Sequence, residues 1–458
     1  MKEYDVIVIG SGSGTIIVEQ ALAHGQTVAL VDKGPFGGTC LNVGCIPSKI
    51  LTAAADKVLE IQEASQLGVR AEGVRADFPA IMERMRKLVR DDQKTSPDSV
   101  RLIPGLDLYE QLGHFVDEYT MDVAGEKIRG RKIFIVSGAR PLIPPLKGID
   151  AVDYLTNETL LEISRKPETL IIVGGGYIAA EYGHFFSAMG TRVTILQRGA
   201  RLLKEEEPEI SAVLQSLLAK RLHIHTQAEA LEVRTEGTEI KVFARDLKTG
   251  RNREFRAEKV LLAAGRESNA DRLKLQNTGV EVDDRNFVRV NDYLETSRKN
   301  IWAAGDAIGQ KMFKHAANWE ADVAWRNAFH GEKLKVDLNV IPHAVFTHPE
   351  IASVGMGEKE AAKTYDILVG LARYMDVARG QALAEKDGLA KIIVEKQTGK
   401  ILGFHIIGPD ASILIQEVIN AISAGATVEP LLNGLHIHPA MPELVPAAIS
   451  RLAEPEES

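Results

Sequence analysis

The chain has 458 residues, of which 45% are hydrophobic, and it carries a net charge of −8 from 55 basic and 63 acidic side chains. This length predicts several compact domains, and the composition excludes a disordered chain. The acidic balance gives no support to nucleic-acid binding. The sequence shows no apolar run of membrane-spanning length and no signal peptide after Met1, so we expect a cytoplasmic protein that engages no membrane.

The first segment predicts a strand, a glycine turn, a helix and a second strand. Residues 4–9 form an almost unbroken apolar run, as in a parallel strand buried on both faces. The turn that follows contains Gly10 and Gly12, and the second strand ends at Asp32. Such a turn lets a pyrophosphate approach the helix N-terminus, and an acidic residue about 20 positions later holds a ribose hydroxyl. We interpret the segment as a dinucleotide site rather than an ordinary tight turn, although Thr15 replaces the last small residue of the pattern.

Cys40 and Cys45 are the only cysteines of the chain, and they lie five positions apart. A secreted disulfide framework needs several pairs, and a zinc site needs a second pair to complete its ligands. A structural bridge here would close only residues 41–44, and the stabilisation by a disulfide falls as its loop shortens. Because each of these alternatives is weak, we interpret the two cysteines as a redox-active pair.

The same strand, turn and helix pattern returns in the middle of the chain. Residues 170–173 predict a strand, and Gly174, Gly176 and Ala179 fit the G-x-G-x-x-A pattern without exception. The chain therefore contains two nucleotide-binding units.

The second strand of this unit, residues 192–196, indicates which nucleotide binds. Gln197 and Arg198 follow directly, and Arg201 and Lys204 lie just beyond. No carboxylate stands there to hold a free 2′-hydroxyl, whereas an arginine suits a 2′-phosphate. The alternative is a solvated basic turn. We predict that the site favours NADPH over NADH.

The rest of the chain predicts further strands and a separate C-terminal domain. The breaker-rich residues 141–148 indicate a domain crossing, and the sequence pattern changes after about residue 336. The remaining predicted elements are strands at 260–265, 301–304, 390–394 and 401–407 and a helix over 412–424. Together these features predict an α/β protein with two Rossmann-like, three-layer nucleotide-binding domains and a C-terminal α+β domain.

A highly specific segment surrounds the two cysteines, Gly37-Gly38-Thr39-Cys40-Leu41-Asn42-Val43-Gly44-Cys45-Ile46-Pro47-Ser48-Lys49. With it the chain resembles the class I pyridine nucleotide-disulfide oxidoreductases, a family that includes dihydrolipoamide dehydrogenase, glutathione reductase, mycothione reductase and mercuric reductase. The resemblance covers nearly the whole chain and includes residues 174–181, 296–306 and 436–443.

The resemblance implies a domain order, two cofactors and an assembly. The implied cofactors are FAD and a nicotinamide nucleotide, the implied assembly is a homodimer, and no metal site is expected. The predicted ranges are an FAD-binding domain over 1–150, an NAD(P)-binding domain over 151–267, a central domain completing the FAD site over 268–335 and a dimerisation domain over 336–458.

The resemblance also implies roles for individual residues. Cys45 corresponds to the thiol whose thiolate lies against the flavin, and Cys40 corresponds to the thiol that exchanges with substrate. Lys49 and Glu181 correspond to an ion pair beside the flavin ring, and Tyr177 corresponds to the cover of the nicotinamide pocket. The complete predicted cofactor sites are Gly10, Gly12, Asp32, Lys49, Gly305 and Asp306 for FAD, and Gly174, Gly176, Tyr177, Ala179, Gln197, Arg198, Lys204 and Gly265 for NAD(P).

His438 corresponds to the acid/base of the family, and Glu443 corresponds to the carboxylate that orients it. In the family this pair reaches the cysteines of the other subunit. A histidine that titrates near neutrality can take a proton from a dithiol. The alternative is a loop histidine beside Pro439, and His436 has no assigned role.

The substrate is expected to be a small dithiol or disulfide. No cysteine remains for the second thiol pair of mercuric or large thioredoxin reductases, and no basic anchors for glutathione are evident. Lipoamide is neutral, so dihydrolipoamide dehydrogenase, with a lipoyl-carrying protein as partner, is the leading interpretation. The NADPH signal and the variant first turn support the alternative, an NADPH-dependent low-molecular-weight disulfide reductase of the mycothione or glutathione type. A non-catalytic flavoprotein subunit is a third hypothesis, which the intact cysteines and His438 oppose.

Overall fold

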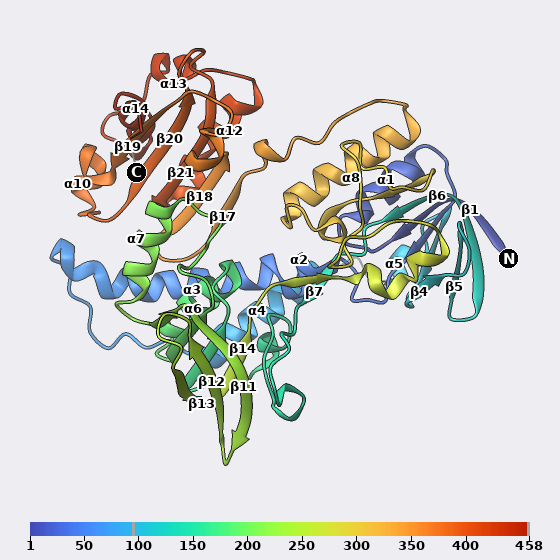
Figure 1. Ribbon diagram of the computed structural model, residues 1–458, viewed down its shortest axis with the longest axis horizontal. Helices are drawn as coiled ribbons and strands as arrows, with labels where there is room; N and C mark the ends of the chain where they lie inside the picture. The colour runs from blue at the N-terminus through green and yellow to red at the C-terminus, as the bar shows by residue number, and fades with distance from the viewer. Residues whose placement is uncertain (94–96, 456–458) are drawn as a thin grey trace. The chain divides into compact units, whose positions relative to one another are not determined.

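A computed structural model describes residues 1–93 and 97–455 (Figure 1). Its contacts divide the chain into two compact units, each built from separated stretches of sequence. The first unit comprises residues 1–48, 83–142 and 265–338, and the second comprises residues 49–82, 143–264 and 339–458. Residues 94–96 and residues 456–458, which end the predicted C-terminal domain, lie outside the described residues.

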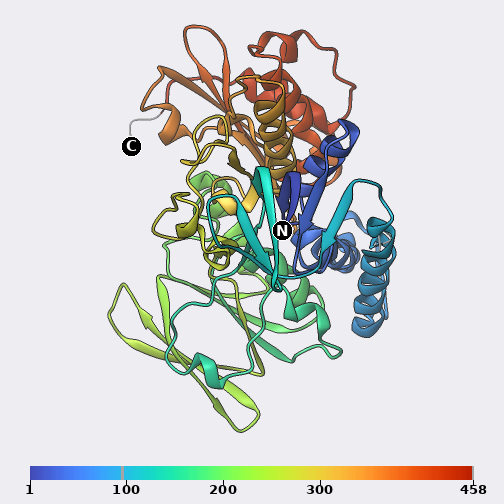
Figure 2. The same cartoon turned by 90° about the vertical axis from the view of Figure 1, so that its right-hand side faces the viewer.

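The first unit is built on a seven-stranded sheet, whose strands surround the N-terminus in Figure 2. The strand order is β3-β2-β1-β6-β5-β4, and β16 also pairs with β6. These strands are β1 (Lys2–Ile9), β2 (Val28–Val31), β3 (Leu106–Tyr109), β4 (Gly113–Phe115), β5 (Thr120–Val123), β6 (Glu126–Ile135) and β16 (Ile301–Ala303). A short antiparallel ribbon joins β7 (Ala139–Pro141) to β15 (Arg266–Ser268).

The register of this sheet places the predicted FAD residues at one edge. Strands β1, β2, β6 and β16 are parallel, and their last residues pair with one another. Gly10 and Asp32 directly follow two of these strand ends, and Gly305 follows a third by two residues. Ligands of parallel sheets bind outside the carboxyl ends of the strands, so this edge is where a cofactor is expected.

The helices that lie wholly within the first unit are α1 (Gly14–Ala23), α2 (Gly38–Val43), α5 (Pro97–Arg101) and α8 (Lys314–Phe329). Helix α1 buries Ile17, Val18 and Ala21, which recur at helical spacing and belong to the apolar core shared with β1 and β2. The core therefore fixes the direction of α1 and, with it, the glycine turn at the start of the helix.

The second unit contains the second nucleotide-binding pattern. Its four-stranded parallel sheet has the order β10-β9-β8-β14, and a separate antiparallel sheet has the order β11-β12-β13. The elements are β8 (Thr169–Val173), α6 (Tyr177–Ala188), β9 (Arg192–Gln197), α7 (Pro208–Leu218), β10 (His223–Thr226), β11 (Ala228–Glu236), β12 (Glu239–Asp246), β13 (Asn252–Ala257) and β14 (Lys259–Leu262). Strand β9 runs one residue beyond its predicted end and includes Gln197.

The C-terminal part of this unit is a five-stranded antiparallel sheet of order β17-β18-β21-β20-β19, covered by short helices. Its elements are β17 (His343–Val345), β18 (Glu350–Gly355), α9 (Glu358–Ala361), β19 (Ile367–Arg373), α10 (Ala378–Ala382), β20 (Leu389–Glu395), β21 (Ile401–Gly408), α11 (Ala411–Leu414), α12 (Gln416–Ser423), α13 (Glu429–Asn433) and α14 (Leu444–Ile449). The helix expected over 412–424 is interrupted at Ile415. The backbone of Ile415 stays helical, so the interruption is a local irregularity in hydrogen bonding.

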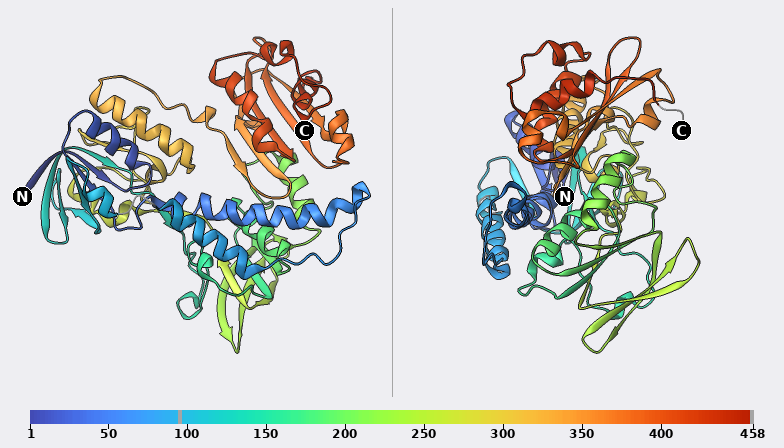
Figure 3. Two further views of the ribbon diagram at one scale, coloured as in Figure 1. Left: turned by 180° about the vertical axis from the view of Figure 1, so that it is seen from behind. Right: turned by 90° about the vertical axis from the view of Figure 1, so that its left-hand side faces the viewer.

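Two long helices, α3 (Cys45–Glu63) and α4 (Phe78–Asp92), were absent from the predicted elements (Figure 3). Each buries apolar residues at helical spacing, namely Leu51, Ala55 and Leu59 in α3 and Phe78, Met82, Met85 and Val89 in α4. This periodicity is the signal that would have revealed them. None of the helices in the described ranges has the length and apolar content needed to cross a membrane.

Candidate active site

The two thiols lie on consecutive helices, with Cys40 inside α2 and Cys45 at the start of α3. A Cβ atom on the intervening Gly44 would lie 2.9 Å from the carbonyl oxygen of Thr39, so only glycine allows the chain to return this closely. A hydrogen bond to the side chain of Cys45 and burial raise the pKa of the Cys40 thiol, whereas the charge of Lys314 lowers it. The two sulfur atoms are thus within interaction distance, with Cys40 half-buried and Cys45 exposed.

Lys49 lies one helical turn after Cys45 on α3 and forms an ion pair with Glu181 on α6. Its Nζ atom lies 2.7 Å from each carboxylate oxygen of Glu181, and the Glu181 side chain is only 5% exposed. The backbone N–H of Phe346 donates a further hydrogen bond of 3.1 Å to Glu181, and the Lys49 ammonium lies 4.6 Å from the centre of the Phe346 ring. The predicted Lys49–Glu181 ion pair is therefore formed, and Phe346 contacts both of its members.

The first glycine turn has the geometry of a pyrophosphate site. Gly10 has a φ of +107°, and a Cβ atom there would lie 2.2 Å from the carbonyl oxygen of Val136, so a side chain is excluded. A Cβ atom on Gly12 would meet only Gly38, at 3.9 Å, which leaves space beside the backbone. The hydroxyl of Thr15 donates to the carbonyl oxygen of Gly12 at 3.0 Å, so the non-glycine residue of the motif supports the turn.

Two further observations fit FAD at this edge of the sheet. Asp32 accepts hydrogen bonds from the backbone N–H groups of Ser11 at 2.6 Å and Gly34 at 2.7 Å, so its carboxylate is fixed where a ribose would lie. The buried hydroxyl of Ser137 has no hydrogen-bond partner among the described residues, and its Cα atom lies 3.3 Å from the position of a Cβ atom on Gly10. An orphaned hydroxyl beside the turn suits a polar group of a bound cofactor.

Asp306 belongs to a group of buried charges that the sequence only partly revealed. Burial raises the pKa of Asp306, and the charge of Arg266, whose Nε lies 3.3 Å from Oδ2, acts against this increase. The N–H of Gly305 donates to Glu320 Oε2 at 2.6 Å, and burial raises the pKa of Glu320 to about 7. The other oxygen of Glu320 is buried and has no hydrogen-bond partner within residues 1–93 and 97–455. The signal for Glu320 was a carboxylate on the apolar face of α8, the face that buries Ala317 and Ala321.

The second glycine turn repeats the geometry of the first. Gly174 has a φ of +125°, and a Cβ atom there would lie 2.1 Å from the carbonyl oxygen of Ala263. Gly176 is the N-cap of α6, and a Cβ atom on it would meet no atom of the described part of the chain within 4 Å. Tyr177 is partly exposed at the first position of α6, and Ala179 is fully buried. The turn thus presents open backbone at a helix N-terminus, as an anionic ligand requires.

Four polar residues lie at or just beyond the end of β9, and they fall into two groups, Gln197 with Arg201 and Arg198 with Lys204. Gln197 donates to the carbonyl oxygen of Arg201 at 3.1 Å, and Arg201 donates to the carbonyl oxygens of Lys204 and Glu206. These two side chains therefore hold the loop. Arg198 is 77% exposed, with Nη1 3.8 Å from Glu229, and Lys204 is also exposed. Arg198 and Lys204 are the cations that can meet a ligand here.

His438 forms the predicted pair with Glu443. Its Nδ1 lies 2.8 Å from Glu443 Oε1, and the N–H of Ala440 donates to Oε2 at 3.0 Å. The hydrogen bond to His438 lowers the pKa of Glu443. An ionised carboxylate only accepts, so Nδ1 carries the proton and Nε2 is the acceptor of a neutral ring. The His438 side chain is 72% exposed.

His436, which had no predicted role, is engaged within its own loop. Its Nδ1 lies 3.0 Å from the carbonyl oxygen of Gly434, and its Nε2 lies 3.3 Å from Glu417. Leu435 and Ile437, on either side of it, are strongly exposed apolar side chains. Residues 435–438 therefore combine His436, which is held by hydrogen bonds, with the exposed His438 and two exposed apolar side chains.

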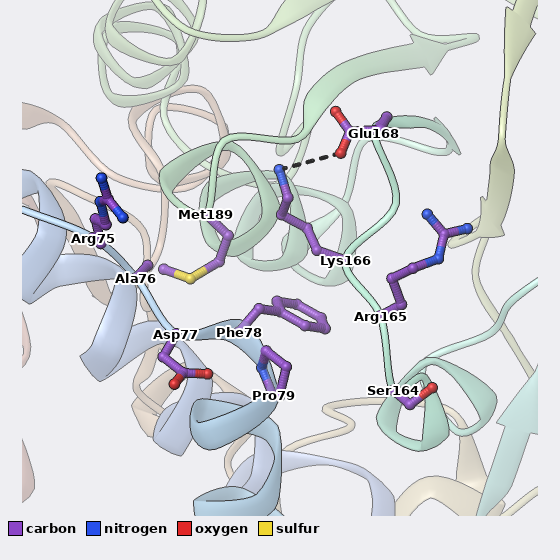
Figure 4. Close-up of a pocket in the computed structure, with 10 residues that line it drawn as sticks. All are labelled: Arg75, Ala76, Asp77, Phe78, Pro79, Ser164, Arg165, Lys166, Glu168 and Met189. Carbon is purple, nitrogen blue, oxygen red and sulfur yellow. Dashed lines mark ion pairs between the residues drawn. The ribbon is translucent and has the colours of Figure 1, made fainter.

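A surface hollow of about 610 Å³ lies elsewhere in the second unit (Figure 4). Its walls come from the start of α4, the segment before β8 and the end of α6, with Phe78 and Met189 beside the Lys166–Glu168 ion pair. Its lining residues are Arg75, Ala76, Asp77, Phe78, Pro79, Ser164, Arg165, Lys166, Glu168 and Met189. None of these is a predicted site residue.

Comparisons with known proteins cover almost all of the chain. The family model described as pyridine nucleotide-disulphide oxidoreductase matches residues 4–321, and the model of the dimerisation domain of that family matches residues 341–449. Mycothione reductase of Mycobacterium tuberculosis is 36% identical over 98% of this chain and 99% of its own length.

Relatives with other names lie at similar distances. Mercuric reductase of Staphylococcus aureus is 34% identical over 96% of this chain and 81% of its own length. Dihydrolipoyl dehydrogenase of Geobacillus stearothermophilus is 33% identical over 96% of this chain and 94% of its own length. The solved structure of the HOCl-induced flavoprotein disulfide reductase RclA from Escherichia coli has a TM-score of 0.85 at 27% identity, covering 98% of this chain and 99% of that one.

The fold, the thiol pair and the comparisons agree. The family implies FAD and a pyridine nucleotide as cofactors, while the relatives differ in substrate and do not single one out. The chain belongs to the pyridine nucleotide-disulphide oxidoreductase family.

Proposed function

We propose that the protein is an NADPH-dependent reductase of a low-molecular-weight disulfide, working through FAD and the Cys40–Cys45 pair. The observation that carries the choice of nucleotide is the end of β9, where Arg198 is exposed and no carboxylate follows the strand. An exposed arginine suits a 2′-phosphate, and its 3.8 Å pair with Glu229 is of the weak surface kind that a ligand can replace.

The residues that would hold FAD come from the predicted FAD domain, 1–150, and the central segment, 268–335. Gly10 and Gly12 would admit the pyrophosphate, Asp32 would hold a ribose and Asp306 would meet the ribityl chain. When bound, FAD accepts two electrons from the nicotinamide and delivers them to the protein disulfide.

The thiol chemistry follows from the placement of the pair. Two electrons open the Cys40–Cys45 disulfide to a dithiol. The Cys40 thiolate then attacks one sulfur of the substrate disulfide, forms a mixed disulfide and releases the first product thiol. Cys45 attacks Cys40, restores the protein disulfide and releases the second product thiol. Gly44 permits this exchange because it allows the two cysteines to approach.

The proton transfers are assigned to His438, whose protonated Nδ1 faces Glu443. Its Nε2 would accept a proton from the dithiol and return it to the leaving thiolate. We infer that His438 acts on the partner subunit's thiols in a homodimer, through the domain that matches the dimerisation model. The exposed Leu435 and Ile437 beside it support this inference, since a dimer interface would cover them.

Dihydrolipoamide dehydrogenase, the leading interpretation from the sequence, stays as the second candidate. The 33% identity to a dihydrolipoyl dehydrogenase favours it, because that value is close to the 36% for mycothione reductase. The same pair would then run in the opposite direction, with a dithiol reducing Cys40–Cys45 and a nicotinamide nucleotide leaving reduced. The two candidates differ in nucleotide, in substrate and in the direction of electron flow.

A stopped-flow experiment separates them. The oxidised enzyme is mixed with NADPH, NADH or dihydrolipoamide while flavin absorbance is followed, and the reduced enzyme is then mixed with a panel of small disulfides. We expect rapid reduction by NADPH. Arg198→Ala should weaken NADPH roughly tenfold and leave NADH unchanged, because it removes one exposed charge-assisted contact. Glu229→Gln is the matched control and should not weaken NADPH. A wild type that prefers NADH and dihydrolipoamide would favour the second candidate.

A further inference from the structure

Residues 198–207 form the loop between β9 and α7, and they carry Arg198 and Lys204, the two exposed cations described above. We call this segment the nucleotide loop. The N–H of Leu203 in the loop donates to the carbonyl oxygen of Gly175 at 2.7 Å. Gly175 is the middle residue of the second glycine turn, so the loop and the turn are joined through their backbones.

The nucleotide loop has a backbone conformation that its sequence does not favour. Leu203 has a φ of +45°, in the left-handed region, which a residue with a Cβ atom adopts only at a cost in free energy. Its side chain is nevertheless buried, and Arg201 bridges over it to the carbonyl oxygens of Lys204 and Glu206. A segment strained in this way keeps its shape only when surrounding contacts fix it, so the anchors of the loop matter.

Glu206 fixes the far end of the nucleotide loop to the C-terminal sheet. Its Oε1 lies 2.6 Å from Nε2 of His343 on β17, and the hydroxyl of Ser353 on β18 donates to its Oε2 at 2.7 Å. His343 and Ser353 lie directly opposite each other in the antiparallel pairing of these strands, so their side chains share one face of the sheet. The two strands therefore hold both oxygens of one buried carboxylate.

The Glu206 carboxylate is ionised in this position. Burial raises the pKa of Glu206, but its contacts with His343 and Ser353 outweigh burial and lower the pKa. An ionised carboxylate only accepts hydrogen bonds, so Nε2 of His343 donates to it. Hydrogen bonds to a charged acceptor are roughly twice as strong as those between neutral groups, so this contact is a firm anchor.

We propose that Glu206 is a positioning residue of the nucleotide site, through which the C-terminal sheet holds Arg198 and Lys204 in place for the 2′-phosphate of NADPH. The inference rests on the proposed function and adds a residue to it. His343 and Ser353 lie in the segment that matches the dimerisation model, so this domain takes part in the choice of nucleotide.

The neighbouring Glu207 also contacts this sheet, but its place in the chain is different. It lies 2.7 Å from Lys391 and is the N-cap of α7. Glu206 instead carries the carbonyl oxygen that Arg201 binds inside the loop. The side chain of Glu206 therefore connects the sheet to the hydrogen bonds that shape the nucleotide loop.

Two measurements on the FAD-loaded enzyme test the proposal without turnover. Hydrogen–deuterium exchange of peptides that cover residues 198–207 reports the order of the loop, and calorimetric titration with NADP⁺ and NAD⁺ reports the contact with the 2′-phosphate. Glu206→Ala should raise exchange in the loop and weaken NADP⁺ roughly fivefold, while NAD⁺ stays nearly unchanged. Glu206→Gln should restore most of both properties, because its amide can accept from His343 and donate to Ser353.

The sign of the change separates positioning from charge. If only the negative charge of Glu206 mattered, both variants would bind NADP⁺ more tightly than the wild type, because each removes a charge that repels a phosphate. In an enzyme that already carries Arg198→Ala and Lys204→Ala, adding Glu206→Ala should not weaken NADP⁺ further, since Glu206 acts through these two cations.

Glu350→Ala is the matched control. Glu350 also lies on β18 and accepts two hydrogen bonds, but both come from Ser412 within the C-terminal sheet domain, so neither loop exchange nor the nucleotide preference should change. Ser353→Ala removes one of the two hydrogen bonds of Glu206 and should shift both measurements in the same direction by less. It takes the place of Glu206→Ala if that variant does not fold.

Wild-type loop exchange and NADP⁺ affinity in a folded Glu206→Ala enzyme would overturn the inference, and so would an equal weakening of both nucleotides. A wild type that binds NAD⁺ more tightly than NADP⁺ would sink the proposed choice of nucleotide. In that case the exchange measurement still decides the anchoring role, because raised exchange in Glu206→Ala supports it and unchanged exchange overturns it.

Discussion

Replacing Lys391 with methionine should destabilise the second unit strongly. Lys391 lies on β20, its side chain is only 2% exposed, and it contacts three carboxylates. Its Nζ lies 2.7 Å from Glu207, 3.1 Å from Glu209 and 2.5 Å from Glu358. Burial lowers the pKa of Lys391, but hydrogen bonds to Glu207 and Glu358 outweigh it and raise the pKa. The ammonium is therefore charged and stabilising throughout the neutral range.

The magnitude follows from what the substitution leaves behind. Methionine fills similar volume, so the packing cost is small, whereas three neighbouring carboxylates lose their common cation. Breaking a buried ion pair costs about 3–5 kcal/mol. Glu209 and Glu358 are partly exposed and water can reach them, so we expect a loss near the lower end, about 3 kcal/mol. Glu207 precedes α7 and ends the loop that carries Arg198, so NADPH binding should weaken as well.

Urea unfolding followed by far-ultraviolet circular dichroism measures this loss. Repeating the unfolding at pH 5 tests its cause, because protonation of the stranded carboxylates should reduce the deficit. Lys391→Met combined with Glu207→Gln should recover part of the stability. Lys400→Met, which removes an exposed lysine close in sequence, is the control. A buried carboxylate without its cation should cause a large loss of stability, and this loss should depend on pH. A deficit below about 1 kcal/mol, or one that is independent of pH, would therefore refute the argument.

Three further outcomes are expected. Cys45→Ser should abolish the long-wavelength absorbance of the reduced enzyme, whereas Cys40→Ser should keep it and lose disulfide exchange; normal turnover in both variants would show that the centre is misplaced. Co-expressed Cys40→Ser and His438→Ala subunits should form heterodimers with about half the wild-type activity, because one active site then contains both substitutions and the other contains neither. Inactive heterodimers would mean that His438 does not act across the interface. Burial lowers the pKa of His348, but hydrogen bonds to Asp56 and Glu63 raise it to about 9 from an ordinary value of 6.5. The protonated ring therefore stabilises the folded unit below pH 6.5, and that contribution is lost as the pH rises toward 9; His348→Gln should remove this part of the pH dependence of unfolding, and a variant with the wild-type profile would contradict it.

The sequence predicted the strands and turns of both nucleotide units because their signals are local. A buried parallel strand is a run of apolar residues, and Gly10 and Gly174 are required by their own backbone conformation. The Lys49–Glu181 pair required the family resemblance, since 132 positions separate its partners. The roles assigned to the site residues remain predictions, although the ion pair and the His438–Glu443 contact are formed.

The residues that the sequence did not reveal are those whose meaning depends on tertiary burial. Lys391 looks like an ordinary surface charge in the sequence, yet its side chain is almost wholly buried, and Glu320 differs only in lying on the apolar face of α8. Arg201 seemed equivalent to Arg198, but it is bound to backbone carbonyl oxygens. Helix α3 is an exception, because its apolar residues recur at helical spacing as far as Leu59 and are visible in the sequence. Burial and partners, which no local pattern encodes, decide what each of these charges does.

A side chain on the first glycine of either turn would clash with a backbone carbonyl oxygen, and this shared constraint bears on ancestry and on engineering. In each unit the first glycine faces the carbonyl oxygen of a residue just beyond a parallel strand, Val136 beyond β6 and Ala263 beyond β14. The surrounding letters differ, Gly10-Ser11-Gly12-Ser13-Gly14 against Gly174-Gly175-Gly176-Tyr177-Ile178, while the steric demand is the same. Such a likeness is what duplication of one ancestral module would leave after its side chains had diverged. Directed-evolution libraries should therefore leave Gly10, Gly12, Gly174 and Gly176 fixed and vary the other residues of the two turns, which already differ from one another.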